Sequence, residues 1–283
     1  MRETAVHEAT RRRYLMCPPT YFDVVYAINP WMRPNDEEGR VDTERAVAQW
    51  TELKDTYERL GHEIHVVDPV PGLPDMVFAA NGGVVLDGRV FGSRFRYVER
   101  LPEAAHYLSW FKTHGSRLGI ADIYVPLAVA EGEGDILIVG DRILAATGFR
   151  TEPQAHRELA DYFGREVLSL ELVDPRFYHL DTALAVLDDE TVAYYPPAFT
   201  PESRELLRMT YPDAIIAHEA DVMVLGLNAV SDGKHVVLPV EAKGFAEQLS
   251  RRGFEPVPVD LSELRKAGGG PKCCTLELRV ESA

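Results

Sequence analysis

The sequence is poor in cysteine, in long apolar runs and in positive charge, and each shortage argues against a class of protein. Only three of 283 residues are cysteines and two of these are adjacent, which argues against a structural disulfide framework. No apolar run approaches the roughly 18 residues that a membrane-spanning helix needs. Residues 1–4 carry charged side chains instead of an apolar signal segment. We therefore predict a cytoplasmic protein that does not enter a membrane.

The shortage of basic residues leaves a net charge of −15. This charge argues against nucleic acid as a partner, because phosphates require a basic surface. It is compatible with a small cationic substrate. The sequence contains no phosphate-binding glycine loop and no dinucleotide-binding fingerprint. The two histidines of residues 62–65 lie three apart in a strand-like run and would point to opposite faces. We expect neither a cofactor nor a metal.

A repeated pattern is present instead. Strand, tight turn, strand and amphipathic helix recur about every 50 residues, with the turns at residues 87–88, 140–141, 188–189 and 232–233. Helical periodicity covers residues 43–60, 102–114, 152–163, 201–209 and 241–252. So many hairpins favour a radial array of α/β units over a doubly wound sheet, which needs longer crossovers. No Pro/Ser-rich linker interrupts the chain, so we predict a single domain over residues 1–283.

A candidate nucleophile lies near the C-terminus. Residues 268–279 read GGGPKCCTLELR and place Cys273 and Cys274 after a glycine-rich turn, where unusual backbone angles can present a side chain. A reactive thiol needs a base and an orienting acid from elsewhere in the chain. The alternative is a pair of small buried side chains on a strand.

A histidine and a carboxylate in one short segment could be that base and that orienting acid. Residues 177–182 read FYHLDT and precede an apolar run. If this segment is a strand, His179 and Asp181 point to the same face and could transfer protons or bind a cation. The alternative is a polar edge, or a core histidine satisfied by its neighbour.

Several motifs, in order and with similar spacing, resemble the guanidino-group-modifying superfamily, which contains arginine deiminases, dimethylarginine dimethylaminohydrolases, arginine dihydrolases and amidinotransferases. The resemblance covers most of the chain. It rests on residues 16–19, 26–32, 74–82, 95–100, 131–135, 148–152, 179–182 and Cys273. It implies a five-fold pseudosymmetric α/β propeller (pentein) of ββαβ-type repeats, with the site on the central axis. It also makes a homodimer plausible.

The resemblance also implies catalytic roles. Cys273 matches the nucleophile, which attacks the central guanidinium carbon and forms a covalent thiouronium. His179 matches the general acid and base, and Asp181 matches the residue that holds the guanidinium. The family's second acid falls, by strict spacing, on a glycine between Glu131 and Glu133. We assign the role to Glu133 because the loop can absorb a one-residue shift, with Glu131 as the alternative.

Further positions match substrate-binding residues of the superfamily. Arg100 and Arg150 match the arginines that bind the substrate carboxylate. Asn81 stands where many members have an aspartate, as in the arginine dihydrolase branch, and it offers an amide but no charge. The remaining candidates for lining the pocket are Asp75, Phe78 and Asn29.

The sequence therefore predicts a cysteine hydrolase, dimethylarginine dimethylaminohydrolase-like, that acts on the guanidino carbon of arginine or an Nω-methylated arginine. An arginine dihydrolase and an amidinotransferase remain as alternatives, since residue types do not separate water from an amine as the acceptor. A catalytically silent ligand-binding protein of the same fold is the non-enzymatic alternative.

Overall fold

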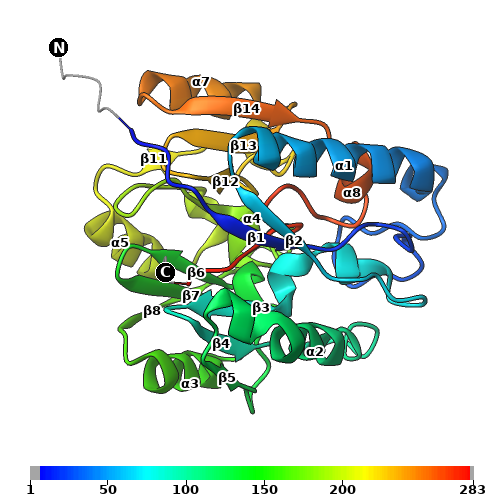
Figure 1. Cartoon of the computed structure of the whole chain (residues 1–283). Helices are drawn as coiled ribbons and strands as arrows, with labels where there is room; N and C mark the ends of the chain where they lie inside the picture. The colour runs from blue at the N-terminus through cyan, green and yellow to red at the C-terminus, as the bar shows by residue number, and fades with distance from the viewer. Residues whose placement is uncertain (1–6, 281–283) are drawn as a thin grey trace.

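The computed structural model describes residues 7–280, which form small sheets surrounded by helices (Figure 1). Within these residues there are five three-stranded sheets. Four follow one another along the chain. Their strands are β3 (Gly83–Leu86), β4 (Arg89–Gly92) and β5 (Asp122–Tyr124); β6 (Ile136–Val139), β7 (Arg142–Thr147) and β8 (Val167–Glu171); β9 (Leu184–Val186), β10 (Val192–Tyr194) and β11 (Ile215–Ile216); and β12 (Val230–Ser231), β13 (His235–Pro239) and β14 (Glu255–Val259). The fold is mixed α/β, as predicted.

Each sheet repeats one connection. Two strands pair antiparallel as a hairpin, a helix follows, and the third strand returns parallel to the second. The connecting helices lie outside the sheets and are α2 (Glu103–His114), α3 (Pro153–Phe163), α5 (Pro201–Thr210) and α7 (Lys243–Arg251). The ββαβ order and the hairpin positions predicted from sequence are therefore confirmed.

The fifth sheet is assembled from both ends of the described chain. Strand β1 (Arg13–Met16) pairs antiparallel with β15 (Leu276–Glu277) and parallel with β2 (Glu63–Val66). Helix α1 (Thr43–Arg59) connects β1 to β2, so this sheet has the same ββαβ order if β15 is counted first. The Asp42 side chain caps α1 by accepting a hydrogen bond from the backbone N–H of Arg45.

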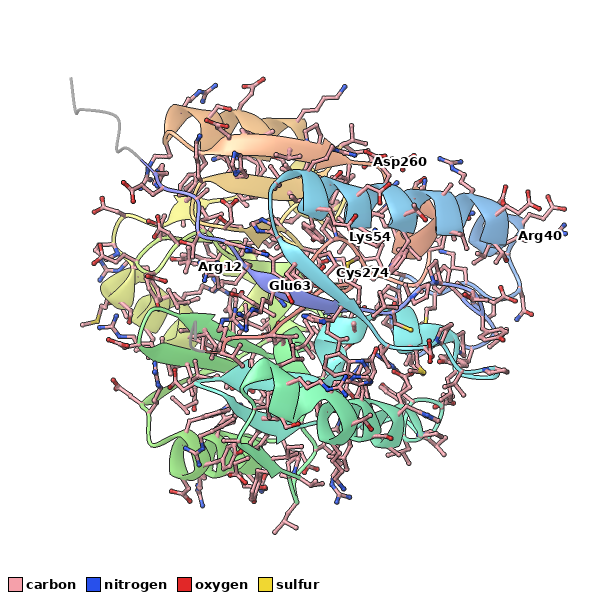
Figure 2. All side chains as sticks on the ribbon, viewed as in Figure 1. Arg12, Arg40, Lys54, Glu63, Asp260 and Cys274 are labelled. Carbon is pink, nitrogen blue, oxygen red and sulfur yellow. The ribbon has the colours of Figure 1, made fainter. Side chains whose placement is uncertain are left out.

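Local sequence explains the hairpins and the core. Asp87 and Gly88 both have positive φ, 51° and 68°, which is the backbone of the tight turn that Asp-Gly favours. Strands β3 and β6 are made of Val, Ile, Leu and a glycine and are buried along their whole length. In Figure 2, Arg40 projects outward near the start of α1, whereas Cys274 lies inside and is fully buried.

Short helical turns lie in the connections between strands. They are η1 (Glu37–Gly39), η2 (Pro74–Val77), η3 (Ala79–Gly82), η4 (Gly115–Leu118), η5 (Gly132–Gly134), η6 (Pro196–Ala198), α4 (Leu180–Ala183), α6 (Glu219–Val222) and α8 (Ser262–Arg265). No helix among residues 7–280 is long and apolar enough to cross a membrane.

Residues 179–182 do not form the strand that the sequence analysis considers. His179 is extended, but the next residues form the single turn α4, because Thr182 donates both its N–H and its hydroxyl hydrogen bond to the His179 carbonyl. The N–H of Leu180 is satisfied by Asp135 at 3.1 Å. Strand β9 begins only after this turn.

Candidate active site

The glycine-rich turn before Cys273 allows the chain to pass unusually close to its neighbours. Gly268 has a φ of +85°. A Cβ on Gly269 would overlap the ring of Phe78, and one on Gly270 would lie 2.9 Å from Asn228 Oδ1. Phe78 is buried against this turn. The turn delivers Cys273, which is 2% exposed, into the interior.

Asn228 fixes the position of Cys273 with both ends of its amide. Its Oδ1 accepts a hydrogen bond from the Cys273 N–H at 3.0 Å, and its Nδ2 lies 3.1 Å from the Cys273 Sγ. The same Nδ2 donates to the backbone carbonyl of Asp181 at 3.1 Å. Asn228 is fully buried. Sequence reasoning missed this residue, because a lone asparagine before a short strand carries no motif.

Asp181 lies on the other side of the thiol. The Sγ of Cys273 is 3.2 Å from Asp181 Oδ2, while Asp181 Oδ1 is buried with no hydrogen-bond partner among the described residues. Burial raises the pKa of Asp181 to about 6, although His179 and Lys272 oppose the rise. Burial and the Asp181 carboxylate together hold the pKa of Cys273 well above its usual value. In the absence of a cation the thiol is therefore protonated.

His179 contacts Glu131. The His179 Nε2 lies 2.8 Å from Glu131 Oε2, and Arg150 Nη1 donates to the same oxygen at 2.9 Å. The other oxygen, Oε1, accepts from the Arg96 N–H at 2.9 Å. Burial opposes ionisation of Glu131, but Arg150 and His179 outweigh it and hold the pKa of this carboxyl well below its usual value.

The assignment of the second acid to Glu133 requires correction. Glu133 accepts hydrogen bonds from Lys272 Nζ and Arg279 Nη1, both at 2.5 Å, and from the Glu277 N–H at 3.1 Å. These partners lie away from His179. Residues 132–134 form the 3-10 turn η5, with Glu131 at its N-cap, and the side chains of residues 131 and 133 leave this turn toward different partners. Glu131 is thus the acid that contacts His179.

The glycines of the 131–135 segment make this contact possible. Gly132 has a φ of +56°, and a Cβ there would lie 2.6 Å from the Ala80 carbonyl oxygen. A Cβ on Gly134 would overlap Asn81 Nδ2 and would lie 3.1 Å from His179 Nδ1. Asp135 braces the loop by accepting hydrogen bonds from the N–H groups of Leu180 and Thr151, at 3.1 Å each.

Arg100 is held by a bidentate ion pair with Glu103, a residue that the sequence reasoning missed. Nε and Nη2 of Arg100 donate to the two Glu103 oxygens at 3.0 and 2.8 Å. The three-residue spacing on one helical turn was the available signal. Burial raises the pKa of Glu103 to about 7, with Arg100 opposing the rise.

Asn81 joins Arg100 to the His179 cluster. Its Oδ1 accepts from Arg100 Nη1 at 2.9 Å, and its Nδ2 donates to the Glu131 carbonyl at 3.0 Å. Asp75 lies beside Arg100 at 3.8 Å and accepts from the Tyr26 hydroxyl at 3.0 Å. The second oxygen of Asp75, Oδ1, is buried without a partner among residues 7–280.

Arg150 and Asn29 lie where the segment before α1 covers the site. The Arg150 guanidinium is stacked between the rings of Tyr97 and Tyr178, 4.7 and 4.8 Å from their centroids, and donates to the Ile28 carbonyl. Asn29 Nδ2 donates to the Ala267 carbonyl at 3.0 Å. Asn29 therefore ties this covering segment to the glycine-rich turn.

The structure thus brings nine of the ten predicted site residues into one connected region and separates Glu133 from it. Within the described residues, no group of three or more His, Cys, Asp or Glu side chains is arranged to hold a metal ion. A thiol beside one buried carboxylate and a histidine beside another can together bind a planar cation and exchange protons with it.

The chain also matches known proteins over nearly its full length. The family described as N,N dimethylarginine dimethylhydrolase, eukaryotic, matches residues 19–280. The chain is 56% identical to the N(G),N(G)-dimethylarginine dimethylaminohydrolase of Mycobacterium tuberculosis over 270 residues, 94% of this chain and 86% of that protein. It is 38% identical to the bifunctional arginine dihydrolase/ornithine cyclodeaminase ArgZ of Synechocystis, but covers only 37% of that longer protein.

Solved structures agree. The N-terminal domain of ArgZ, a mutant bound to substrate, has a TM-score of 0.89 at 37% identity, with 95% of this chain and 98% of that one covered. A dimethylarginine dimethylaminohydrolase adduct with 4-chloro-2-hydroxymethylpyridine shares the fold, with a TM-score of 0.74 at 20% identity, over 95% of this chain and all of that one. The resemblance seen in the sequence is confirmed: the chain belongs to the dimethylarginine dimethylaminohydrolase family, within the guanidino-group-modifying superfamily.

Proposed function

We propose that this protein hydrolyses the guanidino carbon of an Nω-methylated arginine and releases citrulline and an amine, with Cys273 as the nucleophile. Its family makes it a hydrolase of linear amidines. The observation that carries the proposal is the environment of the Cys273 Sγ, 3.2 Å from a buried carboxylate and 3.1 Å from a buried amide. Of the named relatives, the one that is 56% identical is a dimethylarginine dimethylaminohydrolase.

The substrate cation is proposed to bind to Asp181 and to ionise the thiol. The unpartnered Oδ1 of Asp181 provides a buried acceptor beside Cys273. A guanidinium offers donors in a planar fork that fits a carboxylate. Its positive charge lowers the pKa of both neighbouring groups, Asp181 and Cys273, and so opposes the effect of burial. The thiol is then ionised mainly when substrate is present.

The covalent step forms one bond and breaks another. The Cys273 sulfur attacks the central carbon, the bond from this carbon to the substituted nitrogen breaks, and His179 gives the leaving amine a proton. The proton that His179 gives is the one that it has taken from the thiol, so the imidazole is neutral when the amine leaves. Water then attacks the thiouronium carbon and loses one proton to His179. The carbon–sulfur bond breaks, citrulline is released, and the second proton of the water returns to the sulfur.

Glu131 is proposed to keep His179 in place through these steps. Its carboxylate contacts His179 Nε2, which leaves Nδ1 as the ring nitrogen for proton exchange with the substrate. The Glu131 charge also stabilises the imidazolium before the amine leaves. Arg150, bound to the same oxygen, keeps Glu131 ionised.

The substrate carboxylate is assigned to Arg100 and Arg150, as the sequence predicts. Stacking between Tyr97 and Tyr178 fixes the plane of the Arg150 guanidinium. The buried, unpartnered Oδ1 of Asp75 is the proposed partner for the substrate ammonium. Asn29, which is hydrogen-bonded to the Ala267 carbonyl beside the glycine-rich turn, is assigned to the wall of the substrate pocket.

Product analysis tests the function. The purified protein is incubated in parallel with Nω,Nω-dimethylarginine, arginine and citrulline, and products are identified by mass spectrometry. Citrulline and dimethylamine from dimethylarginine alone would support the proposal, and a Cys273→Ala variant should give neither. Failure to convert dimethylarginine would refute it.

An arginine dihydrolase is the second candidate, and Asn81 favours it. The amide of Asn81 places a neutral group between Arg100 and Glu131, where a carboxylate would favour a cation over a neutral ureido intermediate. Two successive hydrolyses would give ornithine, two ammonias and carbon dioxide from arginine. If they occur, Asn81→Asp should stop the reaction after the first ammonia. Release of both ammonias by that variant would show that the second hydrolysis does not require Asn81.

We also propose the arrangement of the five sheets around one axis. Five sheets of equal strand number and one repeated connection support a five-bladed propeller with the site on its axis. The single domain, the homodimer and the cytoplasmic location stay predictions.

A further inference from the structure

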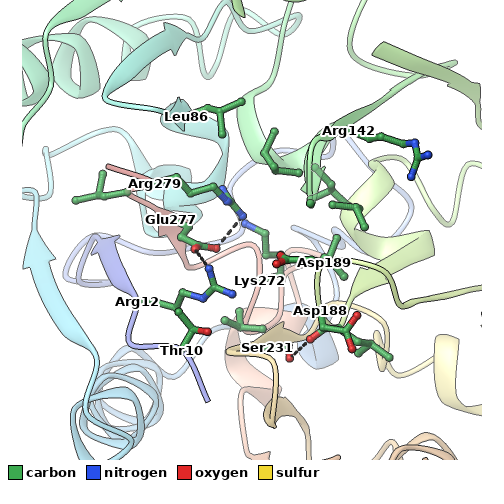
Figure 3. Close-up of a pocket in the computed structure, with 18 of the residues that line it drawn as sticks. Thr10, Arg12, Leu86, Arg142, Asp188, Asp189, Ser231, Lys272, Glu277 and Arg279 are labelled. Atoms are coloured by element: carbon green, nitrogen blue, oxygen red, sulfur yellow. Dashed lines mark hydrogen bonds and ion pairs between the residues drawn. The ribbon is translucent and has the colours of Figure 1, made fainter. Parts of the chain in front are cut away.

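A second cavity lies apart from Cys273, His179 and Asp181. It has a volume of about 890 Å³ and is lined by the hairpin sides of several sheets together with Lys272 and residues 275–280. Figure 3 shows Arg12, Lys272, Glu277 and Arg279 converging in it. Lys272 directly precedes the nucleophile, so the two sites share one segment of chain.

The inner part of this cavity has an excess of positive charge. Arg279 and Lys272 both bind Glu133, at 2.5 Å each. Arg279 and Arg12 both bind Glu277, at 2.7 and 3.2 Å. Among the described residues, three cations thus share two carboxylates. All five side chains are at most 26% exposed, so solvent screens this excess only in part.

Hydrogen-bond donors also remain unused there. Arg12 Nε and the Tyr14 hydroxyl are buried and have no hydrogen-bond partner among the described residues, and both residues line the cavity. A buried polar group without a partner costs about 1–3 kcal/mol. A ligand with acceptor oxygens would supply partners and neutralise the excess charge in one step.

The remaining walls are apolar and the outer rim carries charges of both signs. Leu137, Leu184 and Val186 form part of the apolar wall. At the rim, Arg165 pairs with Asp87 and Asp141. The other charged rim residues are Arg142, Asp188, Asp189 and Glu190. The inner cations beside the apolar wall fit one carboxylate on a short hydrocarbon chain, whereas further carboxylates on the same ligand would lie against apolar side chains.

We propose that this cavity binds a small aliphatic monocarboxylate, with its carboxylate among Arg12, Lys272 and Arg279 and its chain against the apolar strands. Arginine suits this role because its planar fork can grip both carboxylate oxygens. The site is distinct from the one that is assigned to the guanidino substrate, and its occupancy does not depend on turnover.

A carboxylate bound in this cavity is expected to affect the active site through Lys272, and this effect rests on the proposed function. The positive charge of Lys272 lowers the pKa of Asp181, and an anion bound to Lys272 offsets that charge. The acidic limb of the pH profile of kcat/KM is therefore expected to move to higher pH when the cavity is filled.

Binding to the full chain is measured first, by isothermal titration with butyrate as the probe and sodium chloride at equal ionic strength as the blank. We expect saturable one-to-one binding of butyrate and at most weak binding of citrate. Arg12→Gln should weaken butyrate by about ten- to a hundredfold, the value of one charge-assisted hydrogen bond. Arg251→Gln, which removes the same charge from the exposed face of α7, should have no effect.

A second measurement needs no variant. Nuclear Overhauser contacts between butyrate and the methyl groups of Leu184 and Val186 should appear in the unmodified protein. Absence of butyrate binding, unchanged binding by a folded Arg12→Gln variant, or citrate binding as tight as that of butyrate would each overturn the proposal. Because none of these readouts uses turnover, failure of the proposed catalytic function would be seen separately.

Discussion

Two glutamates that lie two residues apart in the sequence, Glu131 and Glu133, provide the sharpest test of the active-site assignment. Replacing each by glutamine removes one buried negative charge and changes the side-chain volume little. Glu131 contacts His179 and Arg150, whereas Glu133 contacts Lys272 and Arg279. The two variants are therefore matched in chemistry and differ in the cluster that they disturb.

The expected magnitudes follow from these contacts. A charge-assisted hydrogen bond contributes about 1.5–3 kcal/mol, so losing the one from His179 to Glu131 should raise the activation barrier by about 3 kcal/mol and lower kcat about a hundredfold. In Glu133→Gln, two partly buried cations lose their shared anion. Breaking such a buried ion pair costs about 3–5 kcal/mol of folding free energy. Its kcat should stay within about tenfold of the unmodified protein, because its partners do not touch His179.

The assay combines steady-state kinetics on dimethylarginine with urea denaturation of both variants. Kinetics are run at a temperature where each variant is folded, so that loss of stability is not mistaken for loss of turnover. If Glu133→Gln abolishes turnover while fully folded and Glu131→Gln retains it, the assignment of Glu131 to His179 is refuted and the original assignment from sequence is restored.

Three further predictions concern the thiol and its neighbours. Cys273→Ala should abolish turnover and covalent labelling by a haloacetamidine, whereas Cys274→Ala should keep both, as mass spectrometry of the intact protein can decide. Asn228→Ala leaves the buried Cys273 N–H without its acceptor, so it should cost about 1–3 kcal/mol of stability in urea and also lower kcat, and an unchanged kcat would contradict its positioning role. Burial raises the pKa of Asp181 from 3.8 to about 6, so its ionised form costs the folded state free energy above pH 6, and this cost fades as the pH falls toward 3.8. Asp181→Asn should therefore abolish turnover. It should nevertheless raise the free energy of unfolding by up to about 3 kcal/mol at pH 8 and by much less at pH 4. An equal gain in the free energy of unfolding at both pH values would contradict the buried-charge explanation.

Much of the fold could be predicted because its signals are local. The Asp-Gly turn with positive φ at Asp87 and Gly88 depends only on two adjacent residues. The helical periodicity of residues 43–60 likewise depends only on residues that are close in sequence. The pairing of β1 with β15 could not be predicted in this way, because it joins Tyr14 to Glu277 and depends on how the intervening sheets are arranged. A local sequence pattern carries no information about a contact between residues that lie so far apart in the sequence.

The site residues also separate into those that a local motif predicts and those that only the folded chain places. Cys273, His179 and Asp181 stand in recognisable motifs, but the direction of a side chain leaving a short 3-10 turn is set by packing, and so Glu133 was preferred to Glu131. Asn228 has no motif, and only the folded chain brings its amide against the thiol. Even the strand expected at His179 gave way to a turn, because Asp135 and Thr182 supply its hydrogen bonds.

The pairing of β1 with β15 has a consequence for biosynthesis. Ribosomes add about 5–20 residues per second, so β1 waits roughly 10–50 s for its antiparallel partner to be synthesised. Throughout that time one edge of a buried, largely apolar strand is unpaired, which is the kind of surface that recruits other chains. Cys273, the proposed nucleophile, is translated in the same late interval. A nascent chain is therefore both catalytically inert and exposed to aggregation until its last sheet closes, and chaperone dependence should be concentrated in that interval.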